Sequence, residues 1–316
     1  MIERIVFMGT PDLAVRVLAA LSENGYPVTL AVTQPDRQKG RGRSVVMPPV
    51  KEYALQRGIP VFQPERLRQD GAFERIAQEA PDLIVVAAFG QILPKNLLEL
   101  PKYRCINVHA SLLPAYRGAA PIQRAVLDGQ KESGVTIMQM DAGLDTGDIL
   151  TQARIPLDDR ETADSLYEKL ADLGAKLLLE TIPQIEAGTV TRTVQNDAEA
   201  TYAAMLHSEM GEIDWSRSAQ EIDRQIRGLN SWPCARTSVD GRRLKVWAAL
   251  PVTGESAGET EPAPAGTIVR IDRQGPVVQT GDGLLVLTEV QPEGKKRMPA
   301  DAYLRGARIG TGAVLG

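Results

Sequence analysis

The chain contains 316 residues, and its 36 basic and 40 acidic side chains give a net charge of −4. This length allows two domains, each with its own core, and the overall charge gives no indication of a nucleic-acid partner. Two cysteines far apart in the sequence, Cys105 and Cys234, argue against a disulfide framework or a cysteine-based metal site. The sequence has no recognisable signal peptide or apolar run of membrane-spanning length, so we expect a cytoplasmic protein.

The first two thirds of the sequence alternate between segments typical of strands and of helices. Continuous apolar runs predict buried strands, and the segments between them have helical character. Strands are predicted at residues 4–8, 28–33, 83–88 and 105–109, and helices at 13–24, 72–80, 121–128 and 162–186. Buried strands separated by helices predict an α/β fold with a Rossmann-like, doubly wound, mostly parallel sheet. Such sheets bind ligands at the carboxyl ends of their strands.

The turn after the first strand reads Gly9-Thr10-Pro11-Asp12. It lacks the Gly-x-Gly-x-x-Gly pattern that brings a dinucleotide close to a helix, so we reject an NAD site. A proline after Thr10 is typical of the first turn of a helix, and Thr10 is predicted to cap that helix.

The connection at residues 36–48 is glycine-rich, basic and long for a strand-to-helix loop. Lys39, Arg41 and Arg43 would contact phosphates of a charged polymer if this loop lies beside the active site. The alternative is an ordinary solvated surface loop.

Two polar side chains, Asn107 and His109, lie two positions apart on the strand predicted at residues 105–109. Side chains at this spacing project from the same face of a strand. An amide and an imidazolium directed at one carbonyl group would stabilise the oxyanion of a tetrahedral intermediate. A downstream carboxylate such as Asp145 would hydrogen-bond the imidazole and select its tautomer. The pattern indicates acyl transfer without a serine or cysteine nucleophile.

Each part of this pattern also has a purely structural interpretation. An Asn-x-His pair can be hydrogen-bonded at the edge of a sheet, and Asp141, Asp145 and Asp148 are typical of turns. The chain has only two histidines, and the second, His207, lies in a polar segment where we expect it to be solvated. Histidine chemistry would therefore use His109.

The last part of the sequence changes character. Residues 190–208 are polar and irregular, and they predict a linker between a first domain at 1–189 and a second at 209–316. A helix is predicted at 219–229, followed by short strands with tight turns, which predict a small barrel. Residues 238–247 are predicted to form a hairpin of two strands with its turn at Asp240-Gly241. Further strands are predicted at 266–271, 277–280 and 284–290.

Two long sequence runs resemble the signature of the folate-dependent formyltransferases. They are CINVHASLLPAYRGAAPIQ at residues 105–123 and GVTIMQMDAGLDTGD at residues 134–148. Within that family, TQPDRQKGRGR at 33–43, IDW at 213–215 and NSWP at 230–233 resemble the branch that formylates methionyl initiator tRNA for translation initiation. The match extends over nearly the whole chain.

The resemblance implies a reaction and a set of site residues. The formyl donor would be 10-formyltetrahydrofolate, the acceptor methionyl initiator tRNA, and the second domain would be OB-like and bind tRNA. We expect a monomer, and the sequence gives no sign of a catalytic metal. The implied catalytic residues are Asn107, His109 and Asp145; the folate contacts are Phe89, Gln91, Leu93, Ser111, Leu112, Leu113, Pro114 and Asp141; and the tRNA contacts are Lys39, Arg41, Arg43, Lys295, Lys296 and Arg297, with Arg242 and Arg243 beside them.

Other functions remain open on the residues alone. The acceptor could be a glycinamide ribonucleotide or an amino-sugar nucleotide, and a hydrolase that releases formate would use the same three side chains. A non-catalytic RNA-binding module on an enzyme scaffold is the alternative from a different class, which the intact Asn107, His109 and Asp145 disfavour.

Overall fold

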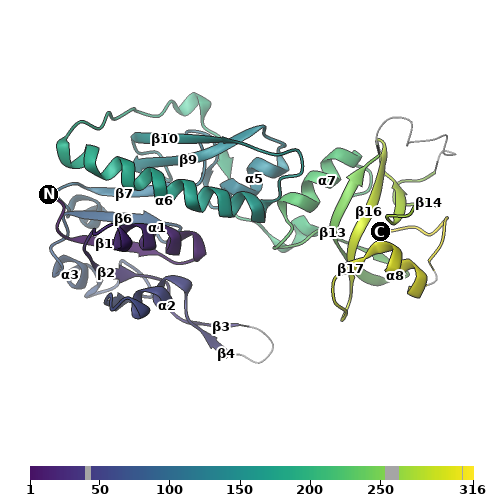
Figure 1. Ribbon diagram of the computed structural model, residues 1–316, viewed down its shortest axis with the longest axis horizontal. Coiled ribbons are helices and arrows are strands. Elements are labelled where there is room, and N and C mark those ends of the chain that lie inside the picture. Colours follow the sequence, from purple (N-terminus) through teal and green to yellow (C-terminus); the bar gives the residue numbers. More distant parts are fainter. Residues whose placement is uncertain (40–43, 253–262, 308) are drawn as a thin grey trace. The chain divides into compact units, whose positions relative to one another are not determined.

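The computed structural model describes residues 1–39, 44–252, 263–307 and 309–316 (Figure 1). The chain forms two compact units. The first unit consists of Met1–Pro121, Glu132–Pro156 and Tyr167–Ala204, and the second of Ile122–Lys131, Leu157–Leu166 and Met205–Gly316. Two short segments from the middle of the chain therefore belong to the same unit as the carboxyl-terminal residues.

The first unit is built on a seven-stranded sheet with the order β10-β9-β7-β6-β1-β2-β5. Its strands are β1 (Ile5–Gly9), β2 (Val28–Val32), β5 (Val61–Phe62), β6 (Leu83–Ala87), β7 (Cys105–His109), β9 (Glu132–Gln139) and β10 (Ile149–Pro156). The strands from β5 to β7 are parallel, whereas β9 is antiparallel to both β7 and β10. The predicted mostly parallel sheet is confirmed. The antiparallel edge was not predicted.

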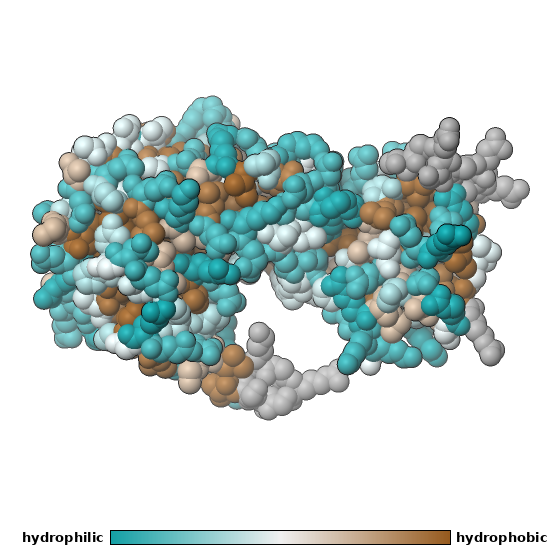
Figure 2. All heavy atoms as spheres, viewed as in Figure 1, coloured by the Kyte–Doolittle hydropathy of each residue, from teal (hydrophilic) through white to brown (hydrophobic). Residues whose placement is uncertain are grey.

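Helices cover both faces of this sheet. They are α1 (Asp12–Glu23), α2 (Pro49–Gln56), α3 (Ala72–Ala77), α4 (Lys95–Glu99) and most of α6 (Ala163–Ala187), whereas α5 (Pro121–Leu127) belongs almost entirely to the second unit. Val6 and Met8 of β1 pack in one buried cluster with Ile76 of α3 and Leu97 of α4. The long helix α6 and α1 lie together on the other face (Figure 1), and the outward side of α6 is hydrophilic (Figure 2). The doubly wound arrangement follows from strands that are apolar on both faces.

The close packing of α6 on the sheet depends on one glycine. A Cβ atom at Gly174 would lie 2.9 Å from Cγ1 of Val108 on β7. This contact shows that Val108 faces α6. The leucines at helical spacing in α6 are predicted to be core residues; Leu166, Leu170 and Leu177 are buried, whereas Leu173 is half-buried.

The start of α1 differs from the prediction. Pro11 is the N-cap residue and makes no side-chain cap, so the predicted capping role of Thr10 is wrong. The hydroxyl of Thr10 instead donates to the carbonyl oxygen of Phe89, at 3.4 Å. The free N–H of Leu13 donates to the Tyr167 hydroxyl, at 2.6 Å. Tertiary partners thus replace the local cap that the sequence predicted.

The basic connection at 36–48 contains a short hairpin rather than only a loop. Strand β3 (Arg37–Lys39) pairs antiparallel with β4 (Ser44–Val46). Val45, Val46 and Met47 are exposed, and hydrophobic surface lies at this hairpin in Figure 2. The predicted tRNA contacts Arg41 and Arg43 lie outside the described residues.

Smaller elements complete the first unit and lead into the second. A two-stranded parallel sheet joins β8 (Arg117–Gly118) to β11 (Tyr202–Ala203). The segment before and after β11 contains the 3₁₀ turns Asp197–Glu199 and Ser208–Gly211. His207 is exposed, as predicted. Among the described residues, no helix is both long enough and apolar enough to cross a membrane.

The second unit carries a curled antiparallel half-barrel. Its order is β12-β13-β16-β15-β14, with β17 paired to β16. The elements are α7 (Ala219–Gly228), β12 (Arg236–Val239), β13 (Arg242–Pro251), β14 (Ile268–Ile271), β15 (Pro276–Gln279), β16 (Leu284–Pro292), β17 (Met298–Pro299) and α8 (Ala300–Ala307). The hairpin turn at Asp240 and Gly241 has positive φ at both residues, 49° and 71°, as its Asp-Gly sequence predicts. Helix α8 was not predicted.

A capping box fixes the start of α7, and its contribution to stability can be tested by substitution. The Ser218 hydroxyl accepts from the Glu221 N–H, and the Glu221 carboxylate accepts from the Ser218 N–H, at 3.3 and 3.0 Å. Replacing Ser218 by alanine is expected to lower the free energy of unfolding by about 1 kcal/mol, measured by denaturant titration. Ser231→Ala is the control, since Ser231 is exposed, and an equal loss in both variants would contradict the prediction.

Hydrogen bonds that the Ser218 hydroxyl and the Ser218 N–H donate to the Glu221 carboxylate, together with Arg217, lower the pKa of Glu221 to about 2 from its ordinary value of 4.5. The stability that Glu221 contributes to the folded state is therefore fully present above pH 4.5 and is lost as the pH falls toward 2.

Candidate active site

The candidate site lies where the parallel strands end. Gly9 of β1 pairs with Ala87 of β6, so these strands end at the same edge as β7. The carbonyl oxygen of Phe89, just beyond β6, accepts hydrogen bonds from Thr10 and from the Gln34 side chain, at 3.4 and 3.1 Å. The segments that follow β1, β2 and β6 are thereby joined at one edge of the sheet, where doubly wound sheets bind ligands.

Asn107 and His109 share one face of β7. Cys105, two residues earlier, packs toward α4, where its thiol donates to the Leu97 carbonyl at 3.3 Å, whereas Val108 faces α6. Strand alternation then places Asn107 and His109 on the α4 side, as predicted. Asn107 is partly exposed, and its amide makes no hydrogen bond to any residue that the structure describes. Its donor is therefore available to a ligand.

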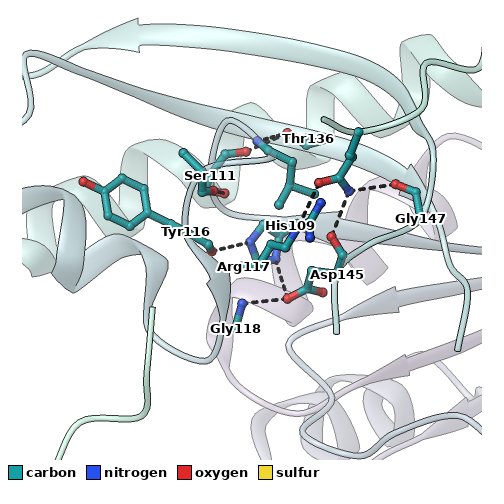
Figure 3. Close-up of polar contacts among 11 residues, drawn as sticks. His109, Ser111, Tyr116, Arg117, Gly118, Thr136, Asp145 and Gly147 are labelled. Atoms are coloured by element: carbon teal, nitrogen blue, oxygen red, sulfur yellow. Dashed lines mark hydrogen bonds and ion pairs between the residues drawn. The ribbon is translucent and has the colours of Figure 1, made fainter. Parts of the chain in front are cut away.

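His109 is buried and both of its ring nitrogens face oxygen atoms (Figure 3). Nε2 lies 3.0 Å from the carbonyl oxygen of Tyr116. Since a carbonyl can only accept, Nε2 carries a hydrogen. Nδ1 lies 3.7 Å from Oδ2 of Asp145. The structure thus brings together His109 and Asp145, as the sequence predicts.

Asp145 is held by a backbone hydrogen bond to Oδ2, the same carboxylate oxygen that faces His109. The Gly118 N–H donates to Oδ2 at 2.8 Å (Figure 3). The residue has a left-handed backbone with φ 54°, which is uncommon outside glycine. The distance to His109 exceeds that of a hydrogen bond, and catalytic contacts of this kind often shorten when substrate binds.

The Ser-Leu-Leu-Pro segment forms a tightly bonded turn beside His109. The Thr136 hydroxyl of β9 donates to the Ser111 carbonyl at 2.7 Å and accepts from the Leu113 N–H at 3.1 Å. The Gln152 side chain of β10 donates to the Leu113 carbonyl at 2.8 Å. Leu113 is buried, and Leu112 lies against Gly134. The antiparallel edge strands therefore shape this turn.

The other predicted folate segment turns its large side chains inward. Phe89 and Leu93 belong to the core cluster beneath the sheet. The Gln91 side chain accepts from the Leu67 N–H at 2.9 Å. Ala88 and Gly90 are exposed and have positive φ of 45° and 80°. This segment therefore presents backbone groups, rather than these side chains, at the sheet edge.

Asp141 closes its own loop. Its Oδ1 accepts from the Gly143 N–H and the Thr146 hydroxyl, at 3.0 and 2.7 Å. These contacts stabilise the turn that leads to Asp145. Ile92 and Leu144 are exposed.

The predicted basic contacts differ from one another. Lys295 and Lys296 are exposed between β16 and β17. Arg297 forms an ion pair with Glu289 and lies 4.8 Å from the Trp247 ring, so it already has partners. The backbone of Lys39 ends β3.

Two buried polar residues near Asp145 were missed by the sequence analysis. Arg117 is 1% exposed and Gln195 is 7% exposed. Arg117 is labelled in Figure 3, and its side chain donates a hydrogen bond to Gln195. Arg117 stood within a matched motif, but no local pattern distinguishes a buried arginine. Gln195 lies in the segment predicted as a linker.

A cavity in the second unit does not coincide with these residues. It measures about 590 Å³, and all of its lining residues belong to the second unit. Asp223 within it pairs with Arg160 and Arg227, at 3.0 and 2.9 Å. None of the predicted site residues lines it.

The cysteines allow a test of the prediction that no thiol acts as a nucleophile in the reaction. Burial raises the pKa of the Cys105 thiol to about 12, and it also raises the pKa of Cys234. Since the thiolate is the nucleophile, iodoacetamide at pH 8 is expected to leave both unmodified in the native protein and to alkylate both after denaturation. Intact mass measures this, and rapid native alkylation of Cys105 would contradict the burial argument.

Comparisons with known proteins identify the family of the chain. The chain matches the model "Formyl transferase" over residues 3–182 and "Formyl transferase, C-terminal domain" over residues 205–308. It is 50% identical over 313 residues to methionyl-tRNA formyltransferase from Lachnospira eligens, covering 99% of each chain. The Bacillus subtilis (strain 168) enzyme of that name is 49% identical over 314 residues, covering 99% of this chain and 98% of its own.

A solved structure shares the fold at low sequence identity. HypX from Aquifex aeolicus, in complex with tetrahydrofolic acid, superposes with a TM-score of 0.65 at 18% identity. The match covers 96% of this chain and 47% of that one, so this chain spans about half the length of HypX. With both family models matched in order and relatives at half identity over the full length, the chain belongs to the formyl transferase family.

Proposed function

We propose that this chain transfers the formyl group of 10-formyltetrahydrofolate to the α-amino group of methionyl initiator tRNA, for translation initiation. The observation that carries the proposal is the similarity to two relatives named methionyl-tRNA formyltransferase, at 50% and 49% identity over 99% of the chain. The Asn107, His109 and Asp145 geometry supports it, because these groups can stabilise and protonate the atoms of an acyl transfer.

The acceptor amine needs little activation. An ordinary α-amino group has a pKa of about 7.7–8.0, and an adjacent ester lowers it by withdrawing electrons. Neutral amine is therefore plentiful near neutral pH, and its lone pair forms the new bond to the formyl carbon. The folate supplies that carbon in an activated amide. The protein must stabilise negative charge on the formyl oxygen and move a proton from the amine to folate N10.

We assign these tasks to the three side chains at the end of β7. Asn107 has an amide free to donate to the formyl oxygen. For His109 to donate as well, the formyl oxygen must replace the Tyr116 carbonyl at Nε2, now 3.0 Å away. That exchange becomes favourable as the oxygen gains charge, because hydrogen bonds to charged acceptors are stronger. Asp145 orients the ring through Nδ1 and assists proton movement.

The folate-binding surface would combine backbone and turn. The exposed peptide groups around Ala88 and Gly90 suit the polar edge of a pterin ring, and Phe89 supports them from the core. The turn at residues 111–114, held by Thr136 and Gln152, would form the opposite wall. These residues fit a flat, hydrogen-bonding ring better than a charged sugar phosphate.

The hairpin formed by β3 and β4 would contact the tRNA, with Arg41 supplying a phosphate contact. Arg41→Ala is expected to raise the KM for methionyl-tRNA and to reduce the slope of log affinity against log salt by about 1, with little change in the KM for the folate. Arg57→Ala is the matched control, since Arg57 pairs with Glu23 on the surface. Equal effects of the two substitutions would argue against a specific contact by Arg41.

The direct test uses four acceptors in parallel. The protein is incubated with 10-formyltetrahydrofolate and methionyl initiator tRNA, uncharged tRNA, glycinamide ribonucleotide or an amino-sugar nucleotide, and products are followed by mass. Formylmethionyl-tRNA as the only formylated product is the expected result. Formylation of a small amine, or formate release without acceptor, would contradict the assigned substrate.

Two further properties belong to the same proposal. Charged initiator tRNA is made in the cytoplasm, so we place the enzyme there. We also expect a monomer, which analytical ultracentrifugation at working concentrations would test.

A further inference from the structure

Arg117 is buried to a degree that is rare for an arginine. It is 1% exposed and is the largest of the fully buried side chains among the described residues. Its ion-pair partner Asp197 lies 2.8 Å away but is 84% exposed. Burying a guanidinium costs several kcal/mol unless its hydrogen-bonding groups are satisfied. A surface carboxylate alone is a weak reason to keep this charge inside the fold.

The second partner of Arg117 connects it to the catalytic loop. Nε of Arg117 donates to Oε1 of Gln195 at 3.1 Å. Nε2 of Gln195 donates to the carbonyl oxygens of Asp145 and Gly147, at 2.8 and 2.7 Å. The Gln195 amide therefore uses its oxygen for the arginine and both hydrogens for the loop.

This arrangement determines which way the amide points. A guanidinium N–H can only donate, so the Gln195 oxygen must face Arg117, and its NH₂ group must face the loop. A reversed amide would set a donor against a donor on one side and an acceptor against two carbonyls on the other. Arg117 thus selects the orientation in which Gln195 can hold the loop.

The loop so held carries the catalytic carboxylate in an unfavourable backbone conformation. Asp145 has φ 54°, and its side chain then reaches the Gly118 N–H at 2.8 Å and His109 at 3.7 Å. Such conformations persist when surrounding contacts over-determine them. Gly118 directly follows Arg117 on β8, so one short strand supplies the anchor for Gln195 and the hydrogen bond to the carboxylate.

We propose that Gln195, oriented by Arg117, is a positioning residue that sets the carboxylate of Asp145 against His109. The inference rests on the proposed function, since it assumes that Asp145 acts in formyl transfer. Among the residues that the structure describes, the Gln195 side chain hydrogen-bonds only to the loop backbone and to Arg117, so its effect on the reaction passes through Asp145.

The test is Gln195→Glu, which keeps the side-chain volume and the partner of Arg117 but replaces both donors by an acceptor. The new oxygen faces two carbonyls, so the loop should shift. Since displacement of about 1 Å can cost about 10²-fold, we expect kcat for formylmethionyl-tRNA synthesis to fall about 10- to 100-fold. The KM values for both substrates should change little.

A double-mutant cycle separates positioning from a general structural role. In an Asp145→Asn background, Gln195→Glu should lower kcat by less than about twofold, because its target has been removed. Asp197→Asn is the matched control, since Asp197 contacts Arg117 but not the loop, and it should stay near wild-type activity. Additive losses in the cycle, or full activity of Gln195→Glu, would overturn the proposal.

The remaining outcomes are also decisive. Each variant is first compared with the wild type by thermal melting. If Gln195→Glu does not fold, Gln195→Met, which has similar volume and no donor, gives the same readout. Unfolding of both would make Gln195 a structural residue and overturn the inference. If the wild-type protein shows no formyl transfer, the proposed function itself is refuted. If the wild type and the Asp145→Asn variant are both active, the role of Asp145 is refuted, and this inference with it.

Discussion

Replacing His109 by alanine is expected to lower kcat about 10²–10³-fold, the usual cost of removing one donor that stabilises an oxyanion. His109 is the ring that lies between the Tyr116 carbonyl and the Asp145 carboxylate, at 3.0 and 3.7 Å. Its loss removes a donor that acts mainly when charge develops, so the KM values should change far less than kcat. Single-turnover formylation of methionyl-tRNA would measure the chemical step directly.

The chain supplies its own control for this substitution. His207 is the only other histidine in the sequence and is exposed. His207→Ala is expected to keep wild-type kcat and melting temperature. If both substitutions reduced kcat equally, or if His109→Ala mainly raised KM, the assignment of His109 to the chemical step would be wrong.

Asp145→Asn is expected to give a folded protein with kcat reduced by about 10²–10³-fold. The asparagine oxygen can still accept from the Gly118 N–H, now 2.8 Å from Oδ2. Its NH₂ group would then take the place of Oδ1, because the Gly118 N–H and Nδ1 of His109 both face Oδ2. The hydrogen bond from Gly118 is kept, but His109 loses the carboxylate that balances a proton added to its ring.

This prediction separates charge from packing. The melting temperature of Asp145→Asn should remain near that of the wild type, while formylmethionyl-tRNA synthesis falls. Asp148→Asn, three positions along the same loop, removes a carboxylate that is not in contact with His109 and should be nearly neutral. Near wild-type kcat in Asp145→Asn would show that the charge of this residue is not needed.

Local sequence pattern was sufficient where a segment's own residues decide its state. The strand predicted at 105–109 is β7, and the helix predicted at 162–186 is α6 within one residue at each end. Both have hydrophobic periodicity strong enough to select one backbone conformation. The hairpin turn at Asp240 and Gly241 was predictable for a related reason, since Asp-Gly tolerates positive φ at both positions.

Prediction failed where a distant partner decides the outcome. Strand β10 alternates buried and exposed residues weakly, and its pairing with β9 extends the sheet in the antiparallel direction. The hydroxyl of Thr10 had a local cap available but bonds the Phe89 carbonyl. Hairpin β3–β4 lies in a segment whose glycines and charges are typical of a loop. Short or polar segments have little intrinsic preference, so tertiary contacts select their structure.

The amino-acid sequence by itself determined the sheet class, the placement of Asn107 and His109 on one face of β7, and the family to which the chain belongs. A strand's period of two residues is sufficient for that placement. Only the tertiary structure decided that Asp145 lies 3.7 Å from His109, and that buried Arg117 and Gln195 hold its loop. Hydrogen bonds between segments far apart in sequence depend on how the chain closes around them, and no local periodicity encodes that closure.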